Sequence, residues 1–469
     1  MRQKYAFISI DGHSLPLAYH LQQERAEVWV GQVSDWRRID AKHDEDREAK
    51  RRRLALYDGL LEKMDAEVLV RQLLRERDKD QWRVIVDFNF LHPYSDVLRR
   101  AGFKGLLPHE EDEELEKDRR KAKQTVEQRY DMLTVGDYQE FKKVKDGEAL
   151  LKRKSDQLFV LKGFNEQAKT IVPKSDDPGV NHAMILDALH RWQREYESDG
   201  FLLEEKVSDL IEFTPSAESF DGELLGVNID IEHKLMGSRN GQQVGCGIDL
   251  VVWQDLNSKV YECFLEPLSD LMLRENELTI WDASVLYSPS KQKFFFGEYC
   301  SDRWGFNAIF SELATIGSTT AYLDRLFSLS PLVDEDTQPI GASVRVFNLR
   351  SDEQAAGQKA SGELIIADIA DPDIWGWDVM RKDNQLYTVG YDKNTLVVTG
   401  AGESVKQAVA QTYRNLSRVQ FDSGFSLQEN DFFDRDFPAN VVRRYEALMA
   451  LGVIGPPEAE EEEAVEENT

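Results

Sequence analysis

A β-α-β pattern opens the chain and decides what kind of sheet can follow. Residues Tyr5 to Ile10 form a mostly apolar run, and Asp11 to Ser14 have the composition of a turn. Residues Leu15 to Gln23 repeat apolar positions at helical spacing, and Ala26 to Val33 have the pattern of a second strand. Strands that are joined through a helix run parallel, so the sequence predicts an N-terminal α/β domain with a Rossmann-like parallel sheet.

The pattern then completes this domain and becomes richer in strands. A helix at Leu54–Arg75, a strand at Arg83–Asp87, a helix at Tyr94–Ala101 and a strand at Lys104–Leu107 are expected in the first domain. Later helices are expected at Tyr138–Lys154, His182–Glu197 and Ser404–Leu416, and later strands at Leu158–Lys162, Phe201–Glu205, Gly222–Ile231, Val244–Trp253, Lys293–Tyr299, Ser343–Asn348, Gln385–Tyr391 and Thr395–Thr399.

The overall charge limits the partners of the chain. Its 469 residues include 58 Lys and Arg against 86 Asp and Glu, a formal net charge of −28. A surface this acidic repels phosphate backbones, so broad nucleic-acid binding is not expected. Three cysteines favour a reducing cytoplasm over a disulfide framework. No apolar run has the length of a signal peptide or a membrane span, so we expect a cytoplasmic protein with no membrane partner.

Charged side chains end several of the predicted strands. Lys162 ends one strand, Glu204 and Glu205 end another, and Glu298 lies near the end of a third. Sheets of α/β proteins bind ligands at the carboxyl ends of their strands. A lysine there can neutralise phosphate, a carboxylate can bind Mg²⁺ that bridges phosphates, and Glu212 can hold ribose hydroxyls. Each residue alone also fits a solvated strand edge; their order is what indicates phosphoryl transfer.

Six short motifs in the same order resemble those of phosphoribosylamine–glycine ligase, an ATP-grasp enzyme of purine synthesis. The similarity covers nearly the whole chain, from about residue 4 to 450. The segments are Phe7–Leu21 (the family's first strand, G-G-R-E-H loop and helix), Phe159–Gly163 (its V-V-K strand), Leu203–Val207 with Glu212 (E-E-F-L-x-G-x-E), Asp230–Lys234 with Gly241–Gly247 (D-H-K-R and G-P-N-T-G-G-M-G), Glu298–Gly305 (E-F-N-x-R-F-G) and Val397–Gly402 with Ala408–Tyr413 (V-V-T-G-x-G and an A-Y segment).

The resemblance implies a multidomain fold of α/β and α+β type. It divides the chain into an N-terminal α/β domain at 1–108, a two-lobed ATP-grasp core at 109–336 with its small lobe at about 131–206, a C-terminal β-rich domain at 337–452 and a disordered acidic tail at 453–469. The implied enzyme, a monomer or homodimer, joins a small glycine-like carboxylate to an amine through an acyl phosphate. Its implied cofactors are ATP and Mg²⁺, or Mn²⁺ in its place.

The resemblance also implies roles for individual residues. Nucleotide contacts are implied for Lys162, Lys169, Glu204, Glu205, Val207 and Glu212, metal coordination for Glu298 and Asp302, and catalytic contacts for Arg303, Lys234 and His233. Glu298 and Lys162 are the strongest of these candidates. His233 fits a hydrogen-bonded structural histidine equally well, and Arg303 also fits a salt bridge to a neighbouring acid.

The first loop departs from the family pattern. The family's G-G-R-E-H is Asp11–Leu15 here, so the arginine is gone and Asp11 adds negative charge. A phosphate-binding turn offers exposed backbone N–H groups and gains nothing from a carboxylate. The family's G-P-E is Asp87–Asn89 in this chain. Both changes argue against phosphoribosylamine as the amine.

The flap and the metal motif are also altered. The glycine-rich flap is Gly163–Lys169 here and keeps one glycine. Cys300 replaces the asparagine of the metal motif, and one residue is inserted before Arg303, which leaves Asp302 or Asn307 as the second ligand. Two alternatives to the implied reaction therefore stay open. One is a ligase for a different amine, such as a modified nucleoside or base, and the other is a non-catalytic descendant that acts as a binding protein.

Overall fold

The computed structural model describes residues 3–39, 45–164, 170–207, 209–235, 243–301, 307–348, 362–421, 425–427 and 440–455. The chain divides into two compact units. Unit 1 comprises residues 1–110, 213–282 and 301–469, and unit 2 comprises residues 111–212 and 283–300. The predicted domain bounds at 108, 336 and 452 stay a prediction, and the predicted disorder of the tail falls on residues that lie almost wholly outside the described ones.

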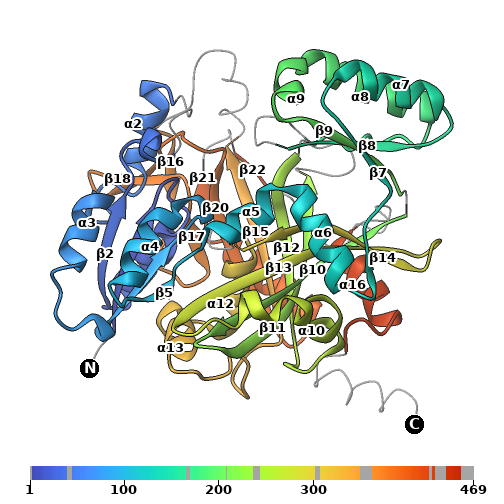
Figure 1. Cartoon of the computed structure of the whole chain (residues 1–469). Helices are drawn as coiled ribbons and strands as arrows, with labels where there is room; N and C mark the ends of the chain where they lie inside the picture. Colours follow the sequence, from blue (N-terminus) through green and yellow to red (C-terminus); the bar gives the residue numbers. More distant parts are fainter. Residues whose placement is uncertain are drawn as a thin grey trace, which may run out of the picture. The chain divides into compact units, whose positions relative to one another are not determined.

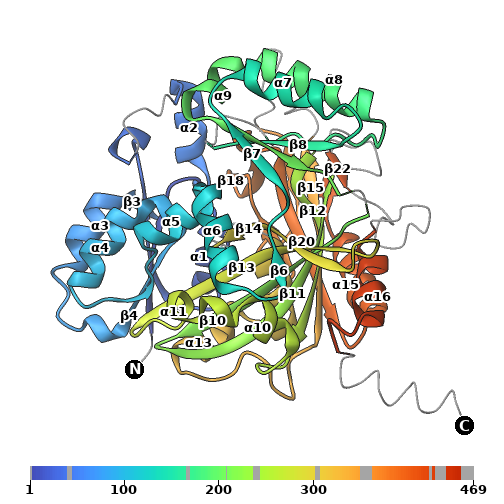
Figure 2. The same cartoon turned by 45° about the vertical axis from the view of Figure 1, so that its right-hand side comes forward.

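A parallel sheet forms the N-terminal part of unit 1, as the sequence predicts. Its strands are β1 (Lys4–Ser9), β2 (Glu27–Gln32), β3 (Lys63–Asp65), β4 (Trp82–Val86) and β5 (Lys104–Leu106), in the order β5-β4-β1-β2-β3. The connecting helices are α1 (Leu15–Gln23), α2 (Arg47–Ala55), α3 (Ala66–Leu73) and α4 (His92–Arg100) (Figure 1, with α1 labelled in Figure 2).

Strand β1 is buried on both faces, which explains its apolar run. Tyr5 and Phe7 belong to a core cluster that includes the apolar side chains of α1. Ala6 and Ile8 point the other way, into a cluster with apolar residues of α3 and α4. A strand covered by helices on both faces of a parallel sheet reads as nearly continuous hydrophobic sequence instead of alternating with polar residues.

The rest of unit 1 is mainly antiparallel. Strands β10 (Ile211–Phe220), β11 (Glu223–Leu235), β12 (Gln243–Gln254), β13 (Glu277–Ser288), β15 (Ile340–Asn348), β17 (Ile374–Gly376) and β20 (Asn394–Gly402) follow β5 in the order β13-β10-β11-β12-β15-β20-β17, and β22 (Phe425–Leu427) pairs with β15. Residues 211–212 of β10 and 283–288 of β13 belong to unit 2. A smaller sheet has the order β18 (Val379–Lys382), β19 (Gln385–Thr388), β16 (Leu364–Ile366), β21 (Gln420–Phe421). The helices are α10 (Lys259–Phe264), α11 (Ser269–Met272), α12 (Asn307–Ile316), α13 (Thr319–Phe327), α15 (Val405–Leu416) and α16 (Val441–Ala450). The predicted β-rich C-terminal region is therefore confirmed.

Unit 2 contains a three-stranded antiparallel sheet covered by helices. Its elements are α5 (Glu110–Lys117), α6 (Arg119–Arg129), β6 (Leu133–Thr134), β7 (Tyr138–Phe141), α7 (Val144–Arg153), β8 (Phe159–Gly163), α8 (Pro178–Arg191), α9 (Gln193–Asp199), β9 (Phe201–Glu205) and β14 (Lys293–Cys300). The sheet has the order β7-β9-β8, and α7 and α8 lie along it (Figure 2). Leu161 and Leu203 of the sheet share a core with Leu150, Ile185 and Leu189 of these helices. No helix in the described ranges is long and apolar enough to cross a membrane.

The single helix predicted at Leu54–Arg75 is wrong, because tertiary hydrogen bonds interrupt it. The chain leaves α2 at Leu56 and turns through Tyr57 and Gly59, whose φ angles are 62° and 71°. The Tyr57 N–H donates to the carbonyl of Val379 at 2.8 Å, and the Asp58 carbonyl accepts from the N–H of Arg381 at 2.8 Å. These bonds fix a turn and the short strand β3 before α3 begins, against the local helical propensity.

The helix predicted at Tyr138–Lys154 is also wrong in its first part. Residues Tyr138 to Phe141 form strand β7 and pair with β9, with Tyr138 opposite Glu204 and Phe141 opposite Phe201. The helix begins only at Val144. The aromatic residues Tyr138 and Phe141 suit a pleated surface, and the partner strand that decides the matter is distant in sequence.

One buried carboxylate in unit 1 organises a turn of the C-terminal region. Asp378 Oδ2 accepts from the N–H of Gly390 at 2.7 Å, and its Oδ1 accepts from the N–H groups of Tyr391 and Asp392 at 3.0 and 3.3 Å. Burial raises the pKa of Asp378 to about 7, and the charge of Asp392 adds to that effect. The folded state therefore retains a proton on Asp378 that the unfolded chain releases.

We predict that this proton makes stability depend on pH. The pKa of Asp378 is near 7 in the folded state and about 3.9 in an unfolded chain, so its contribution to stability is present below about pH 4 and is lost as pH rises through about 7. The variant Asp378→Asn cannot titrate at this position. The free energy of unfolding of the wild type relative to this variant should fall between about pH 4 and 7 and level off above. Urea unfolding across this range measures it, and a constant difference would contradict the prediction.

Candidate functional site

Helix α6 carries a lysine on its buried face. Asp118 caps the helix, because its Oδ1 accepts from the N–H groups of Arg120 and Lys121 at 3.0 and 3.3 Å. Lys123 lies on the same helix face as Val126, which is three residues further along the chain. Lys123 is only 2% exposed to solvent. Its ammonium lies 4.9 Å from the ring centroid of Tyr138. A lysine this deeply buried needs a compensating negative charge.

Glu204 provides that charge and binds a second lysine with the same oxygen. Its Oε2 accepts from Lys123 Nζ at 2.9 Å and lies 3.1 Å from Lys162 Nζ. Lys162 is on β8 and lies opposite Leu202 in the β8–β9 register, so it shares a sheet face with Leu202 and Glu204. One carboxylate therefore links α6, β8 and β9 of unit 2.

The electrostatics of this cluster leave positive charge unbalanced. Burial is the largest influence on the pKa of Glu204 and acts to raise it, but the charges and hydrogen bonds of Lys162 and Lys123 outweigh it and lower the pKa overall. Burial lowers the pKa of Lys123, and the positive charges of Lys162 and Arg119 lower it further. A bound anion would relieve this repulsion.

Glu298 lies beside the same cluster. Its Oε2 is 3.6 Å from Arg119 Nη1, and the side chains of Glu298 and Arg119 are 53% and 25% exposed. Glu298, Arg119 and Lys123 line one small hollow of about 10 Å³, together with Phe296 and Tyr299 of β14. An exposed carboxylate next to this group of cations is open to a metal ion that arrives with phosphates.

Two further predicted nucleotide residues lie on the chain that leaves β9. Glu212 Oε1 accepts a hydrogen bond from Ser284 Oγ at 3.2 Å, within unit 2. Lys206 follows β9 directly, and its Nζ pairs with Asp176 Oδ1 at 3.0 Å. Val207 lines a different pocket, whose wall also includes Glu205. Glu205 pairs with Lys291 at 2.9 Å, so its carboxylate is not part of the ion cluster that Glu204 forms with Lys123 and Lys162.

Two of the predicted catalytic residues belong to unit 1, and three other predicted site residues lie outside the described part of the chain. His233 and Lys234 are on β11 in unit 1, where His233 is buried and Lys234 Nζ lies 3.8 Å from Glu232 Oε2. Lys169, Asp302 and Arg303 lie outside the described residues, as does the side chain of Asn307. In the ranges that are described, no three His, Cys, Asp or Glu side chains converge to hold a metal ion.

Lys123 and Arg119 were not singled out by the sequence. They lie in a run of mainly charged residues from Glu110 to Arg129, most of which are exposed or half-buried. The available signal was helical spacing, since Lys123 is one residue after Ala122 and three before Val126, on the apolar face of the helix. A lysine on an apolar face is unusual enough to mark a buried ion pair.

The fold is that of ATP-grasp enzymes. No protein-family model matches the sequence, and no curated protein matches it. Phosphoribosylamine–glycine ligase from Thermotoga maritima matches with a TM-score of 0.59 and 11% identity, over 91% of this chain and 99% of that one. The biotin carboxylase domain of 2-oxoglutarate carboxylase from Hydrogenobacter thermophilus, crystallised with MgADP, ADP and bicarbonate, matches with a TM-score of 0.58 and 12% identity, over 97% of this chain and 99% of that one. L-amino acid ligase from Bacillus licheniformis matches with a TM-score of 0.52 and 13% identity, over 90% and 99%.

We predict that neutralising Glu204 destabilises unit 2, whereas neutralising its neighbour does not. Glu204→Gln leaves the buried Lys123 without a counter-charge, which should cost about 3–5 kcal/mol. Glu205→Gln is the matched control, because the Glu205–Lys291 pair is partly exposed to solvent and its loss should cost at most about 1 kcal/mol. Hydrogen exchange of the α6 and β9 amides measures both. Equal protection in the two variants would contradict the prediction.

Proposed function

We propose that the chain is an ATP-dependent ligase that joins a carboxylate to an amine through an acyl phosphate. The observation that supports this best is the cluster of Lys123, Lys162 and Arg119 around Glu204, with Glu298 beside it. Lys123 and Lys162 share the single carboxylate of Glu204, so this triad keeps one positive charge that a phosphate group can balance. The ATP-grasp fold agrees with this interpretation, and one structure with this fold is a complex with MgADP.

Each residue of the cluster has a distinct proposed role. Lys162 and Lys123 bind phosphate oxygens, and Glu204 holds the two ammonium groups in position before ATP arrives. Arg119 sits next to Glu298 and offsets charge on the transferred phosphoryl group. Mg²⁺, when bound, would neutralise phosphate charge at Glu298, which suits an ion that prefers one or two carboxylates plus phosphate oxygens.

The proposed chemistry has two steps. A substrate carboxylate oxygen attacks the γ-phosphorus of ATP, the bond from this phosphorus to the β–γ bridging oxygen breaks, and ADP leaves. The amine nitrogen then attacks the carbonyl carbon of the acyl phosphate, inorganic phosphate leaves, and the nitrogen loses a proton. Positioning and charge neutralisation supply most of the catalysis in such transfers.

The first loop in unit 1 favours an amine other than phosphoribosylamine. The N–H of Gly12 donates to Ser9 Oγ at 2.9 Å, and the N–H of Ser14 donates to Asp87 Oδ2 at 3.0 Å. These N–H groups are used within the protein, so they are not available to cradle a phosphate.

Asp11 in the same loop is held by side chains of the protein. Tyr391 Oη donates to Asp11 Oδ1 at 2.8 Å, and Arg53 Nε lies 4.0 Å from the same oxygen. Arg53 is itself buried and pairs with Glu45 at 2.7 Å. Tyr391 and Arg53 therefore hold the Asp11 carboxylate in the loop, where its negative charge would repel a phosphate group. This arrangement supports the second candidate function, a ligase for an amine without a phosphate group, such as a modified nucleoside or base.

We predict that Lys162 contributes to ATP affinity through its charge. The change Lys162→Gln removes a charge-assisted hydrogen bond and should weaken Mg-ATP binding about tenfold to a hundredfold. Lys162→Arg should restore most of the affinity, and Lys152→Gln, an exposed lysine of α7, should leave it unchanged. Isothermal titration calorimetry of the full chain measures each. No binding of Mg-ATP to the wild type at millimolar nucleotide would end the ligase proposal.

Turnover separates the substrate alternatives and tests the metal role. We expect ADP release from ATP with a carboxylate and an amine in the wild type, and a loss of at least about a hundredfold in Glu298→Ala, because the metal loses its proposed ligand. The panel should pair glycine with phosphoribosylamine, with nucleosides and with free bases that carry an amino group. Activity only with phosphoribosylamine would reject the second candidate. If Mg-ATP binds but no pair of carboxylate and amine gives ADP release, the result would favour a non-catalytic binding protein.

A further inference from the structure

A hydrogen bond between two neighbouring strands holds one of the predicted nucleotide residues of unit 2 in place. Glu212 is the second residue of β10, and Ser284 lies on β13, the next strand of the sheet. Ser284 Oγ donates to Glu212 Oε1 at 3.2 Å. Ser284 is only 6% exposed, whereas Glu212 is half-buried. The serine hydroxyl is therefore shielded from water, and its one proton is directed at the carboxylate.

A glycine on the following strand makes room for this serine. Gly297 lies on β14, which pairs with β13. A Cβ at position 297 would lie 2.6 Å from Ser284 Oγ and 3.0 Å from Ser284 Cβ. A side chain there would push the serine out of its present position. The bare backbone of Gly297 therefore leaves Ser284 where it reaches Glu212.

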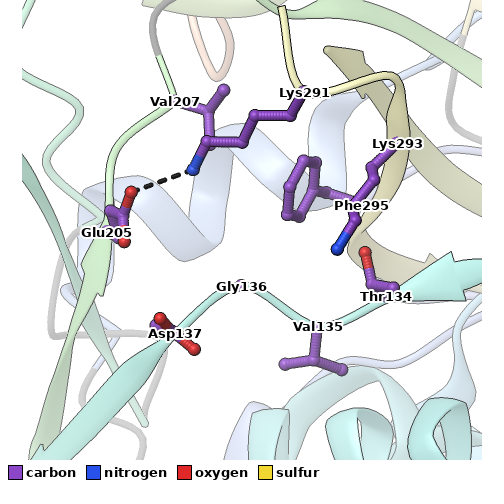
Figure 3. Close-up of a pocket in the computed structure, with 9 residues that line it drawn as sticks. All are labelled: Thr134, Val135, Gly136, Asp137, Glu205, Val207, Lys291, Lys293 and Phe295. Carbon is purple, nitrogen blue, oxygen red and sulfur yellow. Dashed lines mark hydrogen bonds and ion pairs between the residues drawn. The ribbon is translucent and has the colours of Figure 1, made fainter.

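These residues lie on the strand face that borders the pocket of Val207. The pocket has a volume of about 480 Å³, and Phe295 of β14 lines it together with Val207 (Figure 3). Alternate residues of a strand share a face, so Gly297 lies on the same face of β14 as Phe295. A pocket of this volume is within the range of small-molecule sites. The Ser284–Glu212 pair is thus next in line on the wall that would receive a nucleoside.

We propose that Ser284 is a positioning residue that makes the nucleotide site selective for a ribonucleoside triphosphate. Ser284 fixes the carboxylate of Glu212 before the nucleotide arrives, and Glu212 accepts hydrogen bonds from the 2′- and 3′-hydroxyls of the ribose. An ionised carboxylate has about four acceptor positions, so it can accept from ribose hydroxyls while it holds Ser284. The role of Ser284 rests on the proposed function, because it presupposes that a nucleotide binds here.

The physical effect of Ser284 is preorganisation. A glutamate side chain has several rotatable bonds, and ordering them during binding lowers affinity. The bond from Ser284 orders Glu212 in the folded protein before binding. This benefit is realised only by a nucleotide whose sugar hydroxyls bond to Glu212, so it appears as selectivity between nucleotides and not as a uniform gain in affinity.

The same strand provides a matched control. Ser288 ends β13, and its Oγ donates to Asp209 Oδ1 at 2.8 Å. Asp209 Oδ2 also accepts from the N–H of Ser290 at 2.7 Å, so this carboxylate fixes the connection from β13 to β14. Ser288→Ala therefore removes a bond of the same kind, from a serine to a carboxylate, and leaves Glu212 untouched.

Calorimetric titration of the full chain with Mg-ATP, Mg-2′-deoxyATP and Mg-3′-deoxyATP tests the proposal. In the wild type, ATP should bind at least about tenfold more tightly than either deoxynucleotide, since each of these lacks one hydrogen bond to a carboxylate. Ser284→Ala should weaken ATP more than either deoxynucleotide, so that the preference for ATP falls below about threefold. Ser288→Ala should keep the wild-type preference. Ser284→Cys keeps a group of similar size that is a weak donor, and it should behave like Ser284→Ala, which makes it the substitute if Ser284→Ala does not fold.

Four results overturn the proposal. They are equal binding of the three nucleotides by the wild type, a wild-type preference in the folded Ser284 variants, a loss of affinity by the same factor for all three nucleotides in these variants, and an equal loss of preference in Ser288→Ala. The third is the result expected of a serine that only supports the fold. Each of the four requires that Mg-ATP binds, so it leaves the ligase proposal intact. If the folded wild type binds none of the three nucleotides, both proposals fall.

Discussion

The ion triad of Lys123, Glu204 and Lys162 is the interaction on which unit 2 depends. A carboxylate that is 8% exposed holds one ammonium at 2.9 Å and another at 3.1 Å. Such an arrangement is costly to desolvate, and it is retained only when its partners are all present. Because α6, β8 and β9 each supply one member, the triad fixes how this helix meets the sheet. The same three groups leave positive charge at the place where Arg119 and Glu298 lie.

Much of the fold could be predicted from local sequence, because its hydrophobic patterns are strong. The apolar run at β1 and the helical repeat of α1 indicated a parallel sheet, and the structure has one. The strand positions of Lys162, Glu204 and Glu298 were also predictable, since each follows a clear apolar or aromatic run. The roles assigned to these residues stay predictions that the proposed titrations address.

What the sequence did not reveal depends on contacts between distant segments. The turn at Tyr57 and Gly59 exists because Val379 and Arg381 bond to it, more than three hundred residues away in sequence. Lys123 could not be distinguished among the charges of α6 without knowing that Glu204 faces it. The pairing of Asp11 with Tyr391 is of the same kind. In each case a local pattern was compatible with two structures, and a long-range partner selected one.

The sequence of β9, Phe201-Leu202-Leu203-Glu204-Glu205, repeats each residue type once after its phenylalanine. A shift of this strand by one position would still put leucine on leucine and glutamate on glutamate at two places, but it would also put a glutamate at the fully buried place of Leu203. Phe201 adds to this constraint. It is fully buried, its ring stacks on Phe141, and a Cβ at Gly147 would come within 2.9 Å of that ring. The buried leucines and the ring of Phe201 packed against Gly147 therefore decide which of two neighbouring glutamates lies on each side of the sheet.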